Sequence, residues 1–221
     1  MMRPPVQLSF PVPPSWGGRR PGAGRKPTPG RRPDVPHRRR PAHLARHPVH
    51  VTLRTTSAVR CLRARRVFPA LRSALAGSSH GGFRILHFSA QNDHLHLLIE
   101  AEDRERLSRG LRGLAIRVAR AVNRALERRG PVWGDRYHAR PLATPREVRH
   151  ALVYVLANVR KHLRGVQGPD PCSSAGWFTG WHDGPPPEPT EPAPVMRART
   201  WLAAVGWRRH GLLGRDEEPR R

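Results

Sequence analysis

The chain has only two cysteines, two lysines and no long apolar run. The few cysteines argue against a disulfide-rich or zinc-binding protein, and the lack of apolar runs argues against a membrane protein. Cys61 and Cys172 lie far apart, so they form neither a disulfide framework nor the clustered spacing of a zinc site. Such cysteine usage is typical of the reducing cytosol. No stretch approaches the ~18 uninterrupted apolar residues that a membrane span needs. The proline-rich start, MMRPPVQLSFPVPPSWGG, also lacks the apolar segment of a signal peptide, so we expect no membrane partner and a cytoplasmic protein.

Acidic residues are scarce as well. The chain has 16 Asp and Glu against 41 Lys and Arg, a formal net charge of +25 over 221 residues. A charge of this size attracts polyanions, most often nucleic acid. Because only Lys26 and Lys161 are lysines, the excess of Arg can also reflect a biased genomic base composition. The charge therefore favours a nucleic-acid partner, with compositional bias as the alternative.

Composition divides the chain into three parts. Residues 1–46 are built from Gly, Pro and Arg and lack the apolar side chains that would offset the entropy of ordering, so we expect a disordered basic arm that binds DNA. Residues 47–165 show the periodic patterns of a folded domain. Residues 166–221 form a Pro-rich extension with four tryptophans, which suggest that parts of it pack back on the domain or on a ligand. Within the arm, RPGAGRKP allows either plain phosphate contacts or a hook in an AT-rich minor groove.

Hydrophobic periodicity predicts seven elements in the order β-α-β-β-α-β-α. The strands are expected in HPVHVTLRT, GGFRILHFSAQ, NDHLHLLIEA and around residues 137–142. The helices are expected in VFPALRSALAG, over residues 104–129, and from a Thr144 cap to about Arg164. This order predicts the α+β class: a ferredoxin-like antiparallel sheet with helices on one face, plus an extra C-terminal helix.

Two histidines stand one residue apart in the third strand. Since side chains alternate along a strand, His94 and His96 point to one face, while Leu95, Leu97 and Ile99 point to the other. Paired imidazoles on one face of a sheet can be ordinary surface residues. They can also be two ligands of a metal site.

The last helix carries two polar residues away from its apolar stripe. Tyr154 and Asn158 lie one turn apart, so they share a face, and exposure to solvent is their ordinary explanation. If this helix crosses the sheet near His94 and His96, the histidines and Asn158 supply three neutral ligands. Such a set leaves positions open for water or phosphate oxygens. Tyr154 could then attack a phosphorus atom, and the only other tyrosine in the chain is Tyr137.

These segments resemble a known family. The His-hydrophobic-His (HUH) motif of the single-strand tyrosine transposases, the insertion-sequence-200-like group, is similar to NDHLHLL. Its REP-associated tyrosine transposase branch has a Trp-x-x-Arg-Tyr segment before a helix with Tyr, then Asn four residues later, then a basic residue. This pattern resembles GPVWGDRYHARPL followed by LVYVLANVRKH. The resemblance covers about residues 47–165 and extends to DPCSSAGWFTGW and TWLAAVGWRRHGLL.

The resemblance implies a nuclease and strand transferase that acts on single-stranded DNA, often at a hairpin. By position, Tyr154 would be the nucleophile that forms a 5′-phosphotyrosine, and His94, His96 and Asn158 would bind Mg²⁺ or Mn²⁺. Imidazole ligands shift the preference toward Mn²⁺. The protein would be nucleoid-associated, and a homodimer is left open. Residues expected to contact DNA are the basic ones of the arm, the long helix, the segment around Tyr137 and the end of the last helix: Arg19, Arg20, Arg25, Lys26, Arg112, Arg120, Arg136, Arg140, Arg160 and Lys161.

One departure from the family pattern affects the last helix. Relatives commonly carry Asn-Pro-Val-Arg, whereas here Asn158 is followed directly by Val159 and Arg160. Without the proline, the helix is expected to continue uninterrupted.

Two alternatives remain. The first is a ferredoxin-like RNA or DNA binder without chemistry, which would display aromatic residues on adjacent central strands. Phe83 and Phe88 have opposite parity in one strand, which argues against it. The second is a domesticated relative that binds hairpins but no longer transposes.

Overall fold

The computed structural model describes residues 42–157, 168–187 and 189–217. The arm predicted for residues 1–46 lies almost wholly outside them, so its disorder stays a prediction. None of the helices in the described ranges is both long and apolar enough to cross a bilayer.

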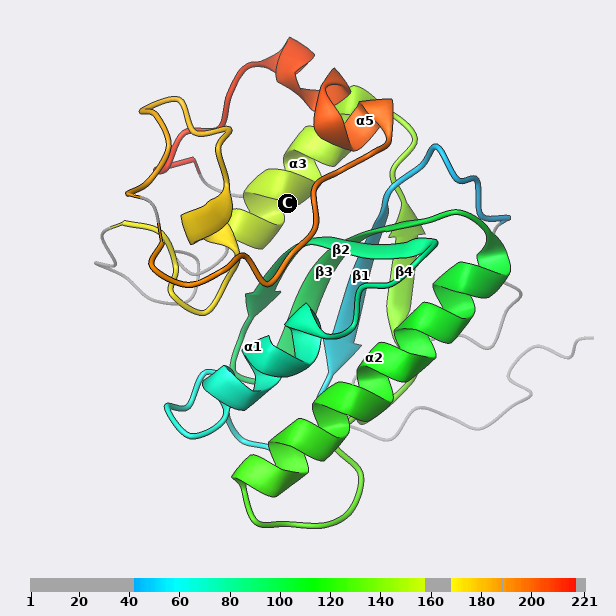
Figure 1. Ribbon diagram of the computed structural model, residues 1–221, viewed down its shortest axis with the longest axis vertical. Coiled ribbons are helices and arrows are strands. Elements are labelled where there is room, and N and C mark those ends of the chain that lie inside the picture. The colour runs from blue at the N-terminus through cyan, green and yellow to red at the C-terminus, as the bar shows by residue number, and fades with distance from the viewer. Residues whose placement is uncertain (1–41, 158–167, 188, 218–221) are drawn as a thin grey trace, which may run out of the picture. The chain divides into compact units, whose positions relative to one another are not determined.

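Four antiparallel strands form a single sheet in the order β2-β3-β1-β4. Their bounds are Val49–Arg54 for β1, Phe83–Ala90 for β2, His94–Ala101 for β3 and His138–Pro141 for β4. With α1 (Phe68–Ala76), α2 (Arg104–Ala125) and α3 (Pro145–Leu156), they give the predicted element order (Figure 1). The prediction of a ferredoxin-like α+β fold with an extra helix is confirmed.

The sheet is covered on both faces by different parts of the chain. The side chains of Leu95, Leu97 and Ile99 are buried in one core with α1 and α2. Leu98 and Leu86 are buried in a second core with α3 and the C-terminal extension. The alternation along β3 therefore places His94 and His96 on the α3 face, as predicted.

A β-bulge in β2 overturns one inference from the sequence. The pairing of β2 with β3 shifts between Ile85 and His87, so one additional residue sits in the strand and the alternation changes phase there. As a result Phe83 and Phe88, which differ in parity, both point into the core under α1 and α2. The parity argument against a nucleic-acid-binding sheet was wrong. The conclusion still holds, because both rings are completely buried and neither can stack on a base.

Helix α3 begins as predicted but ends earlier. Thr144 and Glu147 form a reciprocal capping box, and Pro145 occupies the first turn. The helix ends at Leu156 with Ala157 as its C-cap, so the predicted helix is interrupted there. The part predicted for residues 158–164 lies outside the described residues. Ala157 is 4% exposed and lies with Pro169 and Trp181 around a small pocket, so the end coincides with tertiary packing rather than with Gly or Pro.

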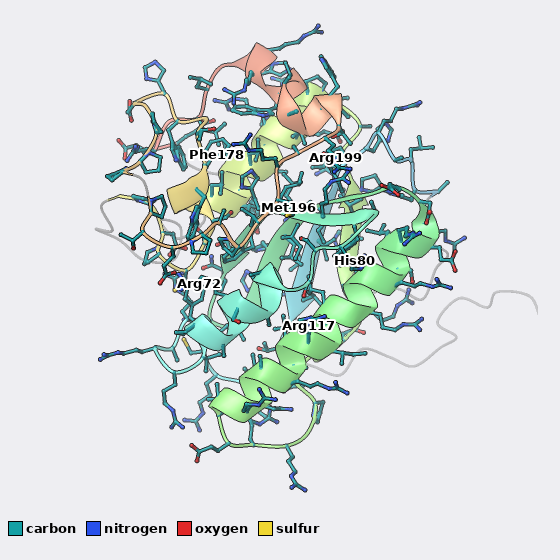
Figure 2. The ribbon with its side chains drawn as sticks, viewed as in Figure 1. Arg72, His80, Arg117, Phe178, Met196 and Arg199 are labelled. Carbon is teal, nitrogen blue, oxygen red and sulfur yellow. The ribbon has the colours of Figure 1, made fainter. Side chains whose placement is uncertain are left out.

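The C-terminal extension packs back on the domain, one of the two alternatives expected from its tryptophans. Phe178, Trp181 and Trp207 are buried against α3 and β2 (Figure 2 labels Phe178). Backbone hydrogen bonds also join the extension to β2, the outermost strand: Ala90 N donates to Cys172 O, Ser174 N to Phe88 O, and Met196 N to Ile85 O. The extension thus satisfies backbone groups that an exposed sheet edge would leave unpaired.

Two buried carboxylates, Asp170 and Glu100, fix the extension further. The Arg63 guanidinium donates two hydrogen bonds of 2.8 Å to Asp170. Glu100 of β3 is 1% exposed and accepts from Arg84, from the backbone N–H of Arg199 and from both N–H and hydroxyl of Thr200. The strand that carries His94 and His96 is therefore tied directly to the extension.

His87 makes the interface with the extension sensitive to pH. It lies beside Ser174 and edge-on to the Phe178 ring, and burial lowers the pKa of His87 to about 4. The unfolded chain binds this proton near pH 6.5, so the free energy of unfolding falls as pH drops from about 6.5 toward 4. We expect His87 to account for a loss of about 2 kcal/mol between pH 7 and pH 5. Urea unfolding at the two pH values should show a correspondingly smaller loss in His87→Gln, and equal losses in both proteins would contradict the assignment.

Candidate active site

His94 and His96 lie together on the face of β3 that α3 covers. Their side chains are nearly buried, at 8% and 3% exposure, and their ring centroids are 4.6 Å apart. The antiparallel pairing sets Thr52 of β1 opposite His96, and Arg54 opposite His94. The two imidazoles are thus held at the centre of the sheet, with β1 beside them.

Each histidine has a hydrogen-bond partner at Nδ1. The Asp93 carboxylate lies 2.6 Å from Nδ1 of His94, and the Thr52 hydroxyl lies 3.1 Å from Nδ1 of His96. Partial burial opposes ionisation of Asp93, but the hydrogen bond and charge of His94 and the Arg54 guanidinium hold the pKa of this carboxyl below its usual value. Such partners fix ring orientation, so a bond to a metal would have to come from Nε2 of each ring.

Tyr154 of α3 joins the two histidines. Its ring is edge-on to His96, with centroids 4.9 Å apart and planes at 85°. The side chain is partly exposed, while its helical neighbours Val153 and Val155 are buried. Tyr154, predicted to lie outside the apolar stripe of the helix, therefore lies against the histidines of the sheet.

His50 of β1 belongs to the same cluster, and the sequence analysis missed it. Its ring stacks on His96 at 5.3 Å and lies edge-on to Tyr154 at 5.5 Å. Desolvation, followed by the charges of His138 and Arg140, lowers the pKa of His50 to about 4, so this imidazole is neutral at pH 7. The alternation of β1 predicts that His50 and Thr52 share a face. Only the pairing of β1 with β3 shows that this face is the one that carries His94 and His96.

The half of this face formed by β1 and β4 is open and basic. Arg54, His138 and Arg140 are exposed there, and Arg140 is on the strand position opposite His50. Arg54 pairs with Asp93, and Arg140 pairs with Glu147 at the start of α3. Exposed guanidinium groups beside the cluster suit the phosphates of a nucleic-acid strand.

The other residues expected to contact DNA are more scattered. Arg136 is partly buried in the segment before β4. Arg112 and Arg120 are exposed on α2, on the opposite face of the sheet from Tyr154. The remaining positions lie outside the described residues: Asn158, Arg160, Lys161, Arg19, Arg20, Arg25 and Lys26. Tyr137 and Trp133 pack partly buried against the core, and Trp133 Nε1 donates to Ala115 O.

The sequence of the domain also matches a known protein family. The family model described as "Transposase IS200 like" matches residues 44–156, which is just over half of the chain. The chain belongs to the IS200-like transposase family. It is therefore a DNA transposase, a class of enzyme that cleaves DNA.

Two solved structures are similar to this transposase at low identity. One is a REP-associated tyrosine transposase bound to a REP hairpin, with 17% identity, a TM-score of 0.47, and coverage of 58% of this chain and 74% of that one. The other is a protein from Deinococcus radiodurans R1 assigned as a transposase, with 18% identity, a TM-score of 0.37, and coverage of 43% and 78%. Among curated proteins no sequence matches.

The site offers a divalent cation two imidazole ligands. Within residues 42–157, 168–187 and 189–217, no group of three or more His, Cys, Asp or Glu side chains has the geometry of a metal site. The pair His94 and His96, oriented by Asp93 and Thr52, fits a cation whose other ligands are oxygen atoms. Asn158 was expected to supply one of them, and that expectation stays a prediction.

Proposed function

We propose that this transposase cuts and rejoins single-stranded DNA with Tyr154 as the nucleophile, forming a 5′-phosphotyrosine, and that His94 and His96 hold Mg²⁺ or Mn²⁺. The observation that carries the proposal is the edge-on packing of the Tyr154 ring against the His96 ring, with centroids 4.9 Å apart. This pair lies beside the open, basic half of the sheet formed by β1 and β4. A phenol next to paired imidazoles suits attack on a phosphodiester whose charge is neutralised nearby. The substrate we propose is a hairpin with a single-stranded flank, the class implied by the resemblance of the Trp133 and Tyr154 segments to the REP-associated branch.

The proposed step transfers the DNA phosphate from the 3′ oxygen to the hydroxyl oxygen of Tyr154. Tyr154 Oη forms a bond to phosphorus, the bond from phosphorus to O3′ breaks, and the 3′ oxygen leaves as a hydroxyl. The phenolic proton is released to solvent, and an equivalent proton is taken up by the leaving oxygen. Attack of another 3′-hydroxyl on the phosphotyrosine reverses the step and restores Tyr154. The phosphodiester energy is conserved, so no external energy source is required.

The chain's own residues position the reacting groups. Arg140 and Arg54 flank the open half-sheet and can contact phosphates on either side of the scissile bond. Asp93 and Thr52 hold the imidazoles in one orientation. A divalent cation bound at His94 and His96 would supply charge neutralisation at the phosphate.

The test is a trapping experiment with a labelled DNA hairpin that carries a single-stranded flank. In Mn²⁺, the full-length protein is expected to give a covalent protein–DNA adduct on a denaturing gel together with a free 3′-hydroxyl product. A chelator should abolish both, and renewed Mn²⁺ should restore them. Cleavage that survives the chelator would overturn the metal role. Hairpin binding without any adduct would instead support the alternative of a non-catalytic hairpin-binding protein.

The His96→Ala protein tests separately whether the cation binds at His96. Loss of one imidazole ligand is expected to raise the Mn²⁺ concentration needed for half-maximal cleavage by at least about tenfold. Salt-sensitive DNA binding should change little, because the exposed arginines remain. The matched control is His138→Ala, which removes an exposed imidazole from β4, on the far side of β1 from His96. Equal Mn²⁺ requirements in the two variants would remove His96 from the metal site.

A further inference from the structure

A second basic hollow lies on the other side of the molecule. Helices α1 and α2 lie next to each other over the sheet (Figure 1), and a groove of about 580 Å³ runs between them. Its arginines all come from α2: Arg117, Arg120 and Arg124 (Figure 2 labels Arg117). The groove is open to solvent and none of its lining residues is acidic.

The three groove arginines have no ion-pair partner within the described part of the chain. Arg109, on the same helix, pairs with Glu105, and Arg66 pairs with Glu127 near its end. Arg117, Arg120 and Arg124 form no such pair in residues 42–157, 168–187 and 189–217. Three like charges in one groove repel each other, and an anionic occupant relieves that repulsion.

Their spacing suits a phosphate backbone. Residues three and four apart share a helix face, so the three side chains form one row. The row spans about 10 Å, since seven residues rise ~1.5 Å each. One strand of a DNA duplex carries a phosphate for every ~3.4 Å of axis, so about three phosphates fall within the same length.

The floor of the groove permits close approach. Its other residues are mostly small: Ala70, Ser73, Ala74, Gly113, Ala121 and Ala125. A Cβ atom added at Gly113 would meet nothing within 4 Å, so the surface there is open. A second copy of the chain is a poor occupant, because a two-fold contact through this groove would set two rows of arginines against each other.

We propose that the α1–α2 groove binds the phosphate backbone of a second DNA segment, distinct from the strand at Tyr154. The sheet separates the two places, since α1 and α2 share one core and α3 lies on the other face. One short stretch of nucleotides therefore cannot contact both. The inference goes beyond the proposed function, because it holds whether or not Tyr154 is the nucleophile.

The test compares two triple variants of equal charge in the full-length protein. Arg117, Arg120 and Arg124 are replaced by Gln in the groove variant. Arg104, Arg109 and Arg129, all exposed and outside the groove, are replaced by Gln in the control. Binding of a fluorescent blunt DNA duplex is measured by anisotropy over a series of salt concentrations, and thermal unfolding confirms that both variants fold.

We expect the slope of log affinity against log salt to become shallower by roughly 3 in the groove variant, since each lost phosphate contact contributes about 0.9. The control slope should stay near that of the parent protein. Equal slopes in the two variants would overturn the proposal. Poly-glutamate serves as a model of an acidic protein. If the groove variant loses poly-glutamate binding while its duplex binding is unchanged, the proposal is overturned and the groove is assigned to an acidic protein.

The adduct assay with a short single-stranded flank separates this proposal from the proposed function. The short flank at Tyr154 does not reach the groove on the other face of the sheet, so at saturating DNA this assay reports on Tyr154 and not on the groove. If no protein forms an adduct but the groove variant still shows the shallower slope, the proposed function fails and the groove assignment stands.

Discussion

Tyr154→Phe is expected to abolish the covalent DNA adduct and to reduce strand cleavage by on the order of 10³-fold or more, because it removes the oxygen that bonds to phosphorus in the proposed reaction. The change deletes one hydroxyl and keeps the ring that packs edge-on against His96 and His50. Folding and DNA affinity should therefore be preserved. The adduct is measured on a denaturing gel with a labelled single-stranded hairpin and Mn²⁺, and affinity is measured separately by anisotropy.

Tyr137→Phe provides the matched control, since Tyr137 is the only other tyrosine in the chain. Its ring is partly buried against the α1–α2 core, on the opposite side of the sheet from the histidines. This variant should form the adduct at nearly the parent level. Retention of the adduct in Tyr154→Phe would assign the nucleophile to another residue and reject the proposed chemistry.

Glu100→Ala is expected to lower the free energy of unfolding by about 3–5 kcal/mol, because it leaves a buried guanidinium without its counter-charge. Glu100 is 1% exposed and Arg84 is 8% exposed. The same carboxylate accepts hydrogen bonds from Arg199 and Thr200, where the C-terminal extension meets the sheet (Figure 2 labels Arg199). The loss is measured by urea unfolding followed by circular dichroism.

Glu102→Ala is the corresponding control two residues further along the chain. Its carboxylate is 56% exposed and lies 4.0 Å from Arg84, so we expect a loss below about 1 kcal/mol. Similar losses in the two variants would show that the Arg84 charge is tolerated without Glu100. The extension would then be held mainly by the packing of Trp181 and Trp207.

Most of the fold was predictable because its local patterns agree with its tertiary contacts. The alternation along β1 and β3 and the Thr144 cap at the start of α3 each specify one element. The antiparallel order then follows from the sequence of elements. The bulge in β2 was not predictable, since it sets two consecutive side chains, Leu86 and His87, on the side of the distant C-terminal extension, while Ile85 and Phe88 lie in the other core.

The candidate site was partly predictable for the same reason. His94 and His96 follow from strand alternation, and Tyr154 follows from helical phase. His50 required knowledge of which strand pairs with β3, and nothing within its own segment marks it. The contribution of the extension also depends on long-range contacts, since Thr200 and Glu100 are a hundred residues apart in the sequence.

The C-terminal extension makes the two edges of the sheet unequal. It occupies the β2 edge with backbone hydrogen bonds at Ile85, Phe88 and Ala90, while β4 is only four residues long and exposes His138 and Arg140. Under the proposed function, an incoming DNA strand would therefore reach Tyr154 across β4 and β1, where the described residues leave the sheet edge exposed.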